Sequence, residues 1–185
     1  MRFCSIASGS SGNCIYVGSD NTHVLVDIGI SGKKMETGLN SLELTGRDLD
    51  GILITHEHSD HIKGLGVISR KYGIPIYATA GTVDAMVRTN ALGKIPEGIF
   101  HEIQEDEPFM INDLKVNQFT IPHDAAQPVG YRLEHEGHSV GIATDLGKYN
   151  DYIIENLQGL DALLLEANHD IRMLQVGKYP YYLKQ

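Results

Sequence analysis

The feature that most constrains this chain is a run of six residues, His56-Glu57-His58-Ser59-Asp60-His61, called here the histidine motif. The motif follows a short β-branched segment, residues 52–55, and precedes apolar residues at helical spacing that end at Gly73. It therefore lies at the carboxyl end of a strand, where open α/β folds place their chemistry. Three imidazoles and a carboxylate crowded together without a ligand would set desolvated polar groups side by side, so the motif predicts a metal site.

The spacing within the motif suggests how the ligands are divided between two metal ions. His56 and His58 are two residues apart, so their side chains would leave the same face if the strand continued through them. Asp60 and His61 follow at the turn into a helix, where they can point at a second ion. This donor set suits zinc or another borderline first-row metal better than Mg²⁺ or Ca²⁺.

Two further ligands are expected at other strand ends. His123 follows residues 119–122 and can add a third nitrogen to the first ion, and Asp145 follows residues 141–144 and can bridge both ions. Two such ions can hold a hydroxide between them and direct it at a phosphoryl or carbonyl centre. The alternative for each residue alone is an ordinary polar side chain at a strand end. That interpretation is adopted for the remaining histidines upstream of Asp145: His23, His101, His135 and His138.

The rest of the chain alternates strand and helix patterns in its first half and is mainly strand in its second. Apolar residues make up 42% and charged residues 21%, which is ordinary globular usage. Without a repeat or linker, residues 1–185 are expected to form one α/β (α+β) domain with mixed sheets. Strands are predicted at residues 3–7, 14–17, 23–27, 52–55, 75–78, 100–103, 108–111, 114–121, 129–134, 138–144 and 161–166. Helices are predicted at residues 31–42, 62–72, 82–92 and 149–157.

Charge and apolar content limit the partners of the chain. A net charge of −9 argues against attraction of nucleic acid or anionic membrane to the whole surface, although local pairs such as Lys33 with Lys34 and Arg70 with Lys71 could contact phosphate. No apolar stretch is long enough to span a bilayer, and the first residues lack the apolar run of a signal peptide. We therefore expect a cytoplasmic protein with no membrane partner.

The glycine-rich segment Ser8 to Asn13 has two interpretations. Successive backbone N–H groups in such a loop can bind an anion, which makes Ser10, Ser11, Gly12 and Asn13 candidates for contacts with a substrate phosphate. The segment can equally be a tight connection between two strands. It lacks the lysine of a nucleotide P-loop, which argues against nucleoside triphosphate binding.

The histidine motif resembles the H-x-H-x-D-H hallmark of the metallo-β-lactamase-fold hydrolases. Further runs resemble the YycJ (VicX, WalJ) subgroup of that family almost end to end: Ser8 to Asn13, Asp27-Ile28-Gly29, Ser31 to Lys34, Pro122 to Ala125 and Leu165 to Asp170. The resemblance implies a four-layer αβ/βα sandwich with a dinuclear centre between two sheets. It also implies 5′ to 3′ exonuclease activity on double-stranded DNA. Zn, Mn and Fe all fit imidazole and carboxylate ligands, so the sequence does not choose among them.

The resemblance also implies a role for each site residue. His56, His58 and His123 would hold the first ion, Asp60 and His61 the second, and Asp145 would bridge them. Asp60 would also accept a proton from the attacking water. Asp27 corresponds to an acid behind the ligands that orients an imidazole, with a turn residue before Gly29 as the plain alternative.

One departure from the subgroup is visible. The subgroup continues into a Gly-His-Leu-Ser-Asn stretch whose histidine completes the second ion's shell, whereas this chain ends at Gln185. We therefore expect an incomplete second half of the fold, a weaker second metal site, and an uncovered apolar edge through which a homo-oligomer could form. Near the end of the chain, Asn168, His169 and Asp170 are expected to line the site or support its ligands, with His169 as an alternative ligand.

Two other functions remain open at this stage. The metal ligands alone are compatible with a thioester or lactam hydrolase on the same scaffold, because substrate loops rather than ligands separate these activities. The missing histidine is compatible with a catalytically impaired metal-binding fragment that acts only through partner contacts. A metal-dependent phosphodiesterase is the expectation that the subgroup resemblance favours.

Overall fold

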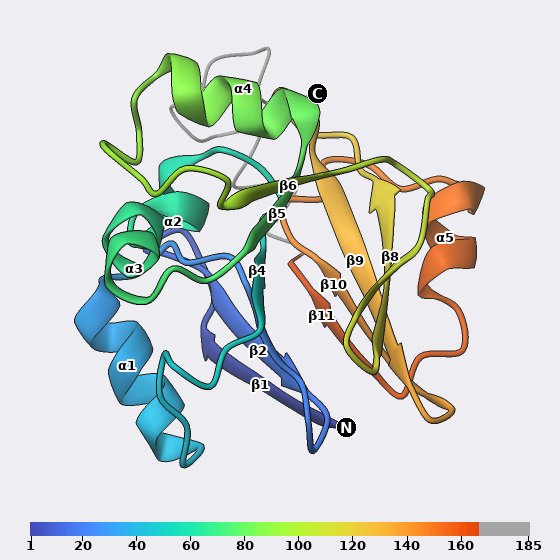
Figure 1. The fold of residues 1–185 in the computed structure, drawn as a ribbon. Coiled ribbons are helices and arrows are strands. Elements are labelled where there is room, and N and C mark those ends of the chain that lie inside the picture. The colour runs from blue at the N-terminus through green and yellow to red at the C-terminus, as the bar shows by residue number, and fades with distance from the viewer. Residues whose placement is uncertain (167–185) are drawn as a thin grey trace.

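The structure is a computed structural model that describes residues 1–166. These residues form two sheets with helices on the outer face of each (Figure 1). Three of the predicted site residues, Asn168, His169 and Asp170, lie outside the described residues.

The first sheet is built from the first half of the chain and is mixed. Its strands follow one another in chain order, antiparallel from β1 to β3 and parallel from β3 to β6. They are β1 (Arg2–Ala7), β2 (Cys14–Gly18), β3 (His23–Val26), β4 (Gly51–Leu53), β5 (Ile76–Thr79) and β6 (Phe100–Ile103). Four helices connect the parallel strands and lie on one side of this sheet (Figure 1): α1 (Gly32–Ser41), α2 (Ser59–Ile62), α3 (Leu65–Tyr72) and α4 (Ala80–Arg88).

Among the described residues, the second sheet has the strand order β11-β10-β9-β8-β7 and is also mixed, because β10 and β11 pair in parallel and its other strands pair antiparallel. Its strands are β7 (Phe109–Ile111), β8 (Leu114–Thr120), β9 (Val129–His135), β10 (His138–Ala143) and β11 (Ala162–Leu165), and α5 (Asp151–Leu157) covers its outer face (Figure 1). Glu136 and Gly137 form the β9–β10 turn with φ values of 48° and 79°, as the sequence predicted.

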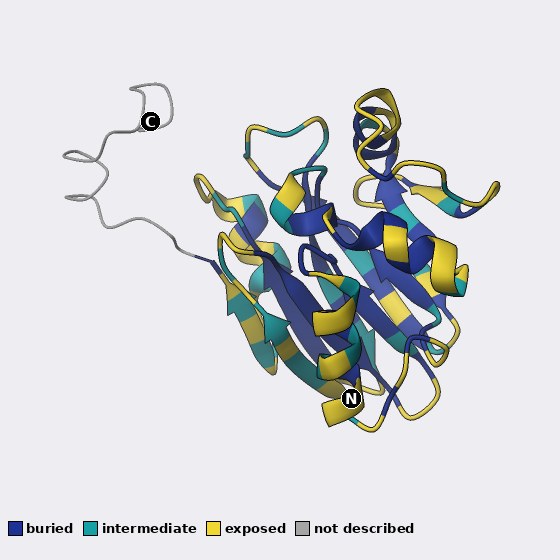
Figure 2. Ribbon diagram, turned by 90° about the vertical axis from the view of Figure 1, so that its left-hand side faces the viewer, coloured by how far each residue is buried: buried dark blue, intermediate teal, exposed yellow. Residues whose placement is uncertain are grey.

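Three apolar layers hold the four structural layers together. One lies between the first sheet and its helices and includes Leu25, Ile52 and Leu65. A second lies between the two sheets, and a third packs α5 against the second sheet. Buried positions accordingly run along the strands, while the exposed positions of the helices face outward (Figure 2). The predicted αβ/βα sandwich with mixed sheets is confirmed.

The structure differs from the predicted elements next to the histidine motif. Strand β4 ends at Leu53, two residues earlier than expected. The helix predicted over residues 62–72 begins at Leu65 as α3, and a break separates it from the short helix α2, which ends at Ile62. The break falls at Gly64, whose N–H donates to the carbonyl oxygen of Ile28 at 2.8 Å. A Cβ at Gly64 would lie 2.1 Å from the carbonyl oxygen of Ile30, so the break lets the chain pack closely against the loop after β3. Helix α4 begins two residues before the predicted Thr82 and ends at Arg88.

Apolar side chains are exposed at the edge of the second sheet. Leu163 and Leu165 on the edge strand β11 are 42% and 47% exposed. Within residues 1–166, no helix has the length and apolar character needed to cross a membrane.

Gly29 provides a test of how the loops are packed beneath the site. A Cβ at Gly29 would lie 1.5 Å from the carbonyl oxygen of Asp60, so Gly29→Ala must push two backbone segments apart. We expect this variant to lower the free energy of unfolding by about 3 kcal/mol or more, measured by urea denaturation. The matched control is Gly32→Ala, whose added Cβ would lie 3.1 Å from the flexible end of the Ile68 side chain and no nearer than 3.7 Å to the Val67 side chain, and its stability should stay within about 1 kcal/mol of wild type. Equal stability of the two variants would contradict the packing described here.

Candidate metal centre

The first three residues of the histidine motif lie in the loop between β4 and α2, and its last three form the first turn of α2, at the carboxyl end of the parallel strands. Because β4 ends at Leu53, the motif is not strand, and the argument that His56 and His58 share one face of a strand is wrong. The loop nevertheless brings the two rings together, with centroids 4.7 Å apart and an interplanar angle of 84°. His56 is fully buried.

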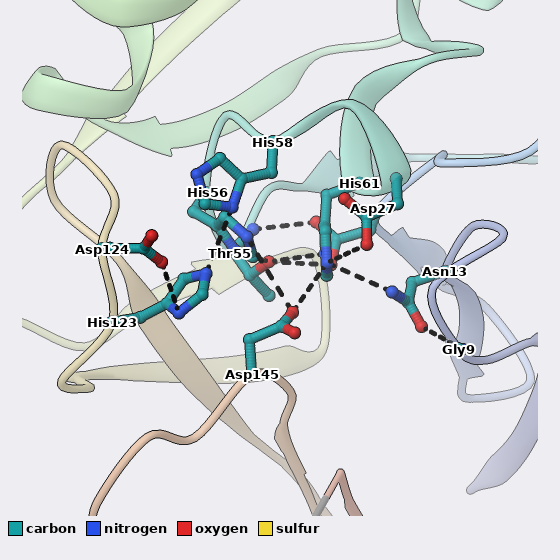
Figure 3. Close-up of polar contacts among 11 residues, drawn as sticks. Gly9, Asn13, Asp27, Thr55, His56, His58, His61, His123, Asp124 and Asp145 are labelled. Atoms are coloured by element: carbon teal, nitrogen blue, oxygen red, sulfur yellow. Dashed lines mark hydrogen bonds and ion pairs between the residues drawn. The ribbon is translucent and has the colours of Figure 1, made fainter. Parts of the chain in front are cut away.

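The first group of candidate ligands contains His56, His58 and His123. One ring nitrogen from each can be chosen so that all three lie within 4.8 Å of one another. The Nε2 atom of His123 lies 3.2 Å from Nδ1 of His58, and His123 reaches this place from the loop after β8 in the second sheet (Figure 3). The structure therefore brings His123 to two histidines that lie more than sixty positions earlier in the sequence.

The second group contains His56, His61 and Asp145, again with one ligand atom from each within 4.8 Å of the others. Asp145 follows β10 with a φ of 55°, and its Oδ2 lies 2.8 Å from His61 Nε2 and 3.9 Å from His56 Nε2. This carboxylate thus stands between the two rings (Figure 3). Asp60 is close as well, with Oδ2 3.7 Å from His61 Nε2.

Asp27 lies behind these rings and is fully buried. Its Oδ1 accepts a hydrogen bond from the Thr55 N–H at 2.9 Å, and its Oδ2 accepts from the Thr55 hydroxyl and from His61 Nδ1, each at 2.8 Å. Because His61 Nδ1 is engaged in this way, Nε2 faces Asp145. The structure therefore places Asp27 where it can orient an imidazole, and not only in a turn.

Thr55 fixes the orientation of His56. Its hydroxyl has one hydrogen, which it donates to Asp27, so it must accept from His56 Nδ1 at 3.0 Å. His56 Nε2 is then left with its lone pair, and this buried atom has no hydrogen-bond partner among residues 1–166. Such an atom is costly unless it finds a partner, and a metal ion would satisfy it. The donor set fits a metal for this reason. Sequence reasoning missed Thr55, although it is a polar residue at the end of an apolar segment.

The surroundings set the protonation of the ligands. Burial, reinforced by the neighbouring imidazoles, lowers the pKa of His56 to about 2, so this ring is neutral and able to bind a metal. Burial also lowers the pKa of His123. Burial opposes the charged form of His61 as well, but the charges of Asp27 and Asp145 outweigh it and raise its pKa to about 10. His61 must therefore release a proton when its Nε2 binds a metal.

The loop that carries His123 is tied to the first sheet. The N–H of Ala126 donates to Glu57 Oε1 at 2.8 Å, and Gln127 accepts from the Gly81 N–H at 2.8 Å. Glu57 therefore joins the histidine motif to the loop of the second sheet. Neither Glu57 nor Gln127 was predicted, and the only available signal was the position of Glu57 inside the motif.

The glycine-rich segment between β1 and β2 lies beside the second ligand group (Figure 3). The N–H of Gly12 donates to the Gly9 carbonyl at 2.9 Å, and the N–H of Asn13 donates to the Asp60 carbonyl at 2.7 Å. These two N–H groups are thus used within the protein, as in a tight strand connection. Ser10 and Ser11 are exposed and stay candidates for a phosphate contact.

Comparison with known proteins shows to which family the chain belongs. A family model described as Beta-lactamase superfamily domain matches residues 22–177. The chain is 40% identical over 185 residues to the exodeoxyribonuclease YycJ of Bacillus anthracis and, over the same length, to the exodeoxyribonuclease WalJ of Streptococcus pneumoniae strain R6. Each match covers the whole chain and 69% of the relative.

A solved structure supports the fold independently. The Zn²⁺-bound PqqB of Methylobacterium extorquens superposes with a TM-score of 0.71 at 18% identity, covering 91% of this chain and 64% of PqqB. This likeness concerns the fold alone. The family match and the two relatives show that the chain belongs to the metallo-β-lactamase superfamily and is a hydrolase related to the YycJ and WalJ exodeoxyribonucleases.

Proposed function

We propose that this chain is a dinuclear metal-dependent phosphodiesterase that degrades double-stranded DNA from the 5′ end. The observation that carries the proposal is the pair of ligand groups that share His56, in a chain that is similar over its whole length to 69% of two exodeoxyribonucleases.

The ligand geometry supports a division between two ions. His56, His58 and His123 would hold one ion, and His61 with Asp60 would hold the other, while Asp145 stands between the groups. Bound divalent ions would supply Lewis acidity, an activated water and charge stabilisation for phosphoryl transfer. Imidazole and carboxylate donors suit Zn or Mn, and Fe is compatible with them.

Asp60 is the residue best placed to accept a proton at this centre. Its side chain is 31% exposed, unlike that of the buried Asp27, and its Oδ2 lies 3.7 Å from His61 Nε2. It is therefore open to water while it stays beside the second ligand group. We propose that its carboxylate takes up the proton of the attacking water.

The negative net charge limits how the chain can hold DNA. Lys71 pairs with Glu36 at 2.5 Å, and Arg70 donates to the carbonyl oxygens of Leu92 and Lys94, so both cations already have contacts within the protein. Lys33 and Lys34 at the start of α1 are exposed. Contact with the DNA backbone must therefore come from a few local groups and from the metal centre itself.

Metal content tests the two-ion proposal. After dialysis with Mn²⁺ or Zn²⁺, we expect wild type to retain two ions per chain by mass spectrometry, and His58→Ala to retain fewer because the first group loses a nitrogen ligand. His138→Ala is the control, since its side chain is exposed and paired with Asp161 away from the ligand groups. Fewer than one ion in wild type, with no hydrolytic activity, would favour the metal-binding fragment instead.

A substitution of Thr55 tests whether the hydrogen bonds of its hydroxyl to Asp27 and His56 affect metal affinity. Thr55→Val keeps the shape of the side chain but removes both hydroxyl contacts, so we expect metal affinity to fall about 10-fold to 100-fold. Thr55→Ser keeps the hydroxyl and should restore most of the affinity, as measured by competition with a chelating dye. Equal affinities for the two variants would show that the hydroxyl contacts do not matter.

Nuclease activity tests the substrate. With Mn²⁺, we expect a 5′-labelled duplex to lose its label as short products before a 3′-labelled duplex does, and Asp60→Asn to slow this about 100-fold or more. A chelator should abolish the activity, and His138→Ala should match wild type. Turnover of a thioester or a lactam without DNA degradation would replace the proposal with the alternative hydrolase.

A further inference from the structure

Asn13 has a fixed position beside the second ligand group. The residue is 1% exposed, and both of its backbone groups are bonded across the site. Its N–H donates to the Asp60 carbonyl, and its own carbonyl accepts from the Gly29 N–H, each at 2.7 Å. The loop between β1 and β2 is thereby held against the turn that carries Asp60 and His61.

The side chain of Asn13 has a defined orientation as well. Its Oδ1 accepts from the Gly9 N–H at 2.9 Å, and because that group can only donate, the amide oxygen must face it. The Nδ2 atom therefore points to the other side, where it lies 3.1 Å from His61 Nε2 (Figure 3). The loop thus presents a hydrogen-bond donor to the ligand group.

This donor lacks a dedicated acceptor. Nδ2 carries two hydrogens, and its hydrogen-bond contact within residues 1–166 is with His61 Nε2, which also lies 2.8 Å from Asp145 Oδ2. Asp27 accepts a hydrogen bond from His61 Nδ1, so Nε2 is the nitrogen that would bind a metal ion. Nε2 has a single lone pair, which cannot bind an ion and accept a hydrogen bond from Asn13 at the same time. An oxygen atom bound beside the same ligand group would accept a hydrogen bond from the Asn13 amide.

We propose that the Asn13 side-chain amide donates a hydrogen bond to a non-bridging oxygen of the phosphoryl group that is hydrolysed. The inference rests on the proposed function and deepens it by naming a substrate contact. In a chain with a net charge of −9, a neutral donor at this place binds phosphoryl oxygen without competing with the metal ions. The contact comes from the side chain, since the Asn13 backbone N–H is already bonded to Asp60.

Phosphate binding tests the proposal apart from turnover. The dissociation constant of inorganic phosphate is measured by calorimetry on Mn²⁺-loaded wild type, Asn13→Ala and Asn13→Asp. Asn13→Asp keeps an acceptor for the Gly9 N–H but removes the amide donor. We expect both variants to bind phosphate about 10-fold or more weakly, with unchanged metal content and melting temperature. The control is Asn40→Ala, an exposed asparagine on α1, which should bind phosphate as wild type does.

A second readout observes the amide itself. The Asn13 side-chain ¹⁵N–¹H resonances, assigned by their loss in Asn13→Asp, should shift when phosphate is added to Zn²⁺-loaded wild type. An unshifted resonance, or absence of phosphate binding by the loaded wild type, would overturn the contact. A loss of metal or of thermal stability in Asn13→Ala that accounts for its weaker phosphate binding would do the same, because Asn13 would then act only by supporting His61.

The outcomes separate this inference from the proposed function. If wild type degrades DNA while both Asn13 variants bind phosphate normally, the substrate contact is wrong and the nuclease proposal stands. If phosphate binding depends on Asn13 but no DNA is degraded, the contact stands and the nuclease proposal is wrong.

Discussion

The buried carboxylate of Asp27 is the interaction on which the site depends. A fully buried charge is costly unless it is well bonded, and three hydrogen bonds, from the Thr55 N–H, the Thr55 hydroxyl and His61 Nδ1, offset that cost. These bonds act on both ligand groups at once. His61 is oriented directly, and His56 is oriented through the Thr55 hydroxyl. One carboxylate therefore determines which ring nitrogen each of these histidines offers.

The two sheets each supply part of the centre, and the layer between them holds the parts in place. The histidine motif follows β4 in the first sheet, whereas His123 and Asp145 follow strands of the second. Tyr131 on β9 is fully buried, and its hydroxyl donates a hydrogen bond to the carbonyl oxygen of Ile54 at 2.7 Å. This bond holds the backbone two residues before the histidine motif. Elsewhere, Asp113 in the turn between β7 and β8 of the second sheet accepts hydrogen bonds from Ser19 and Thr22 in the turn between β2 and β3 of the first. The sheets are thus joined both beneath the site and by this second set of side-chain contacts.

Much of the fold and the candidate ligands could be predicted from the sequence. Strand periodicity predicts the strands. The position of His123 and Asp145 at strand ends predicts them as ligands without any knowledge of their distance from the motif. The reason given for pairing His56 with His58 was wrong, because the strand ends before them and a loop brings the rings together. The roles of Thr55, Glu57 and the Asn13 side chain depend on contacts between distant segments, which no local pattern encodes.

The proposed two-ion centre consists of two adjoining ligand groups that share the buried Asp27 carboxylate as a support. Anomalous scattering from crystals of the Mn²⁺- or Zn²⁺-loaded protein tests this proposal. We expect two peaks, one among His56, His58 and His123 and the other beside His61, Asp60 and Asp145. A single peak, or peaks away from these residues, would contradict it.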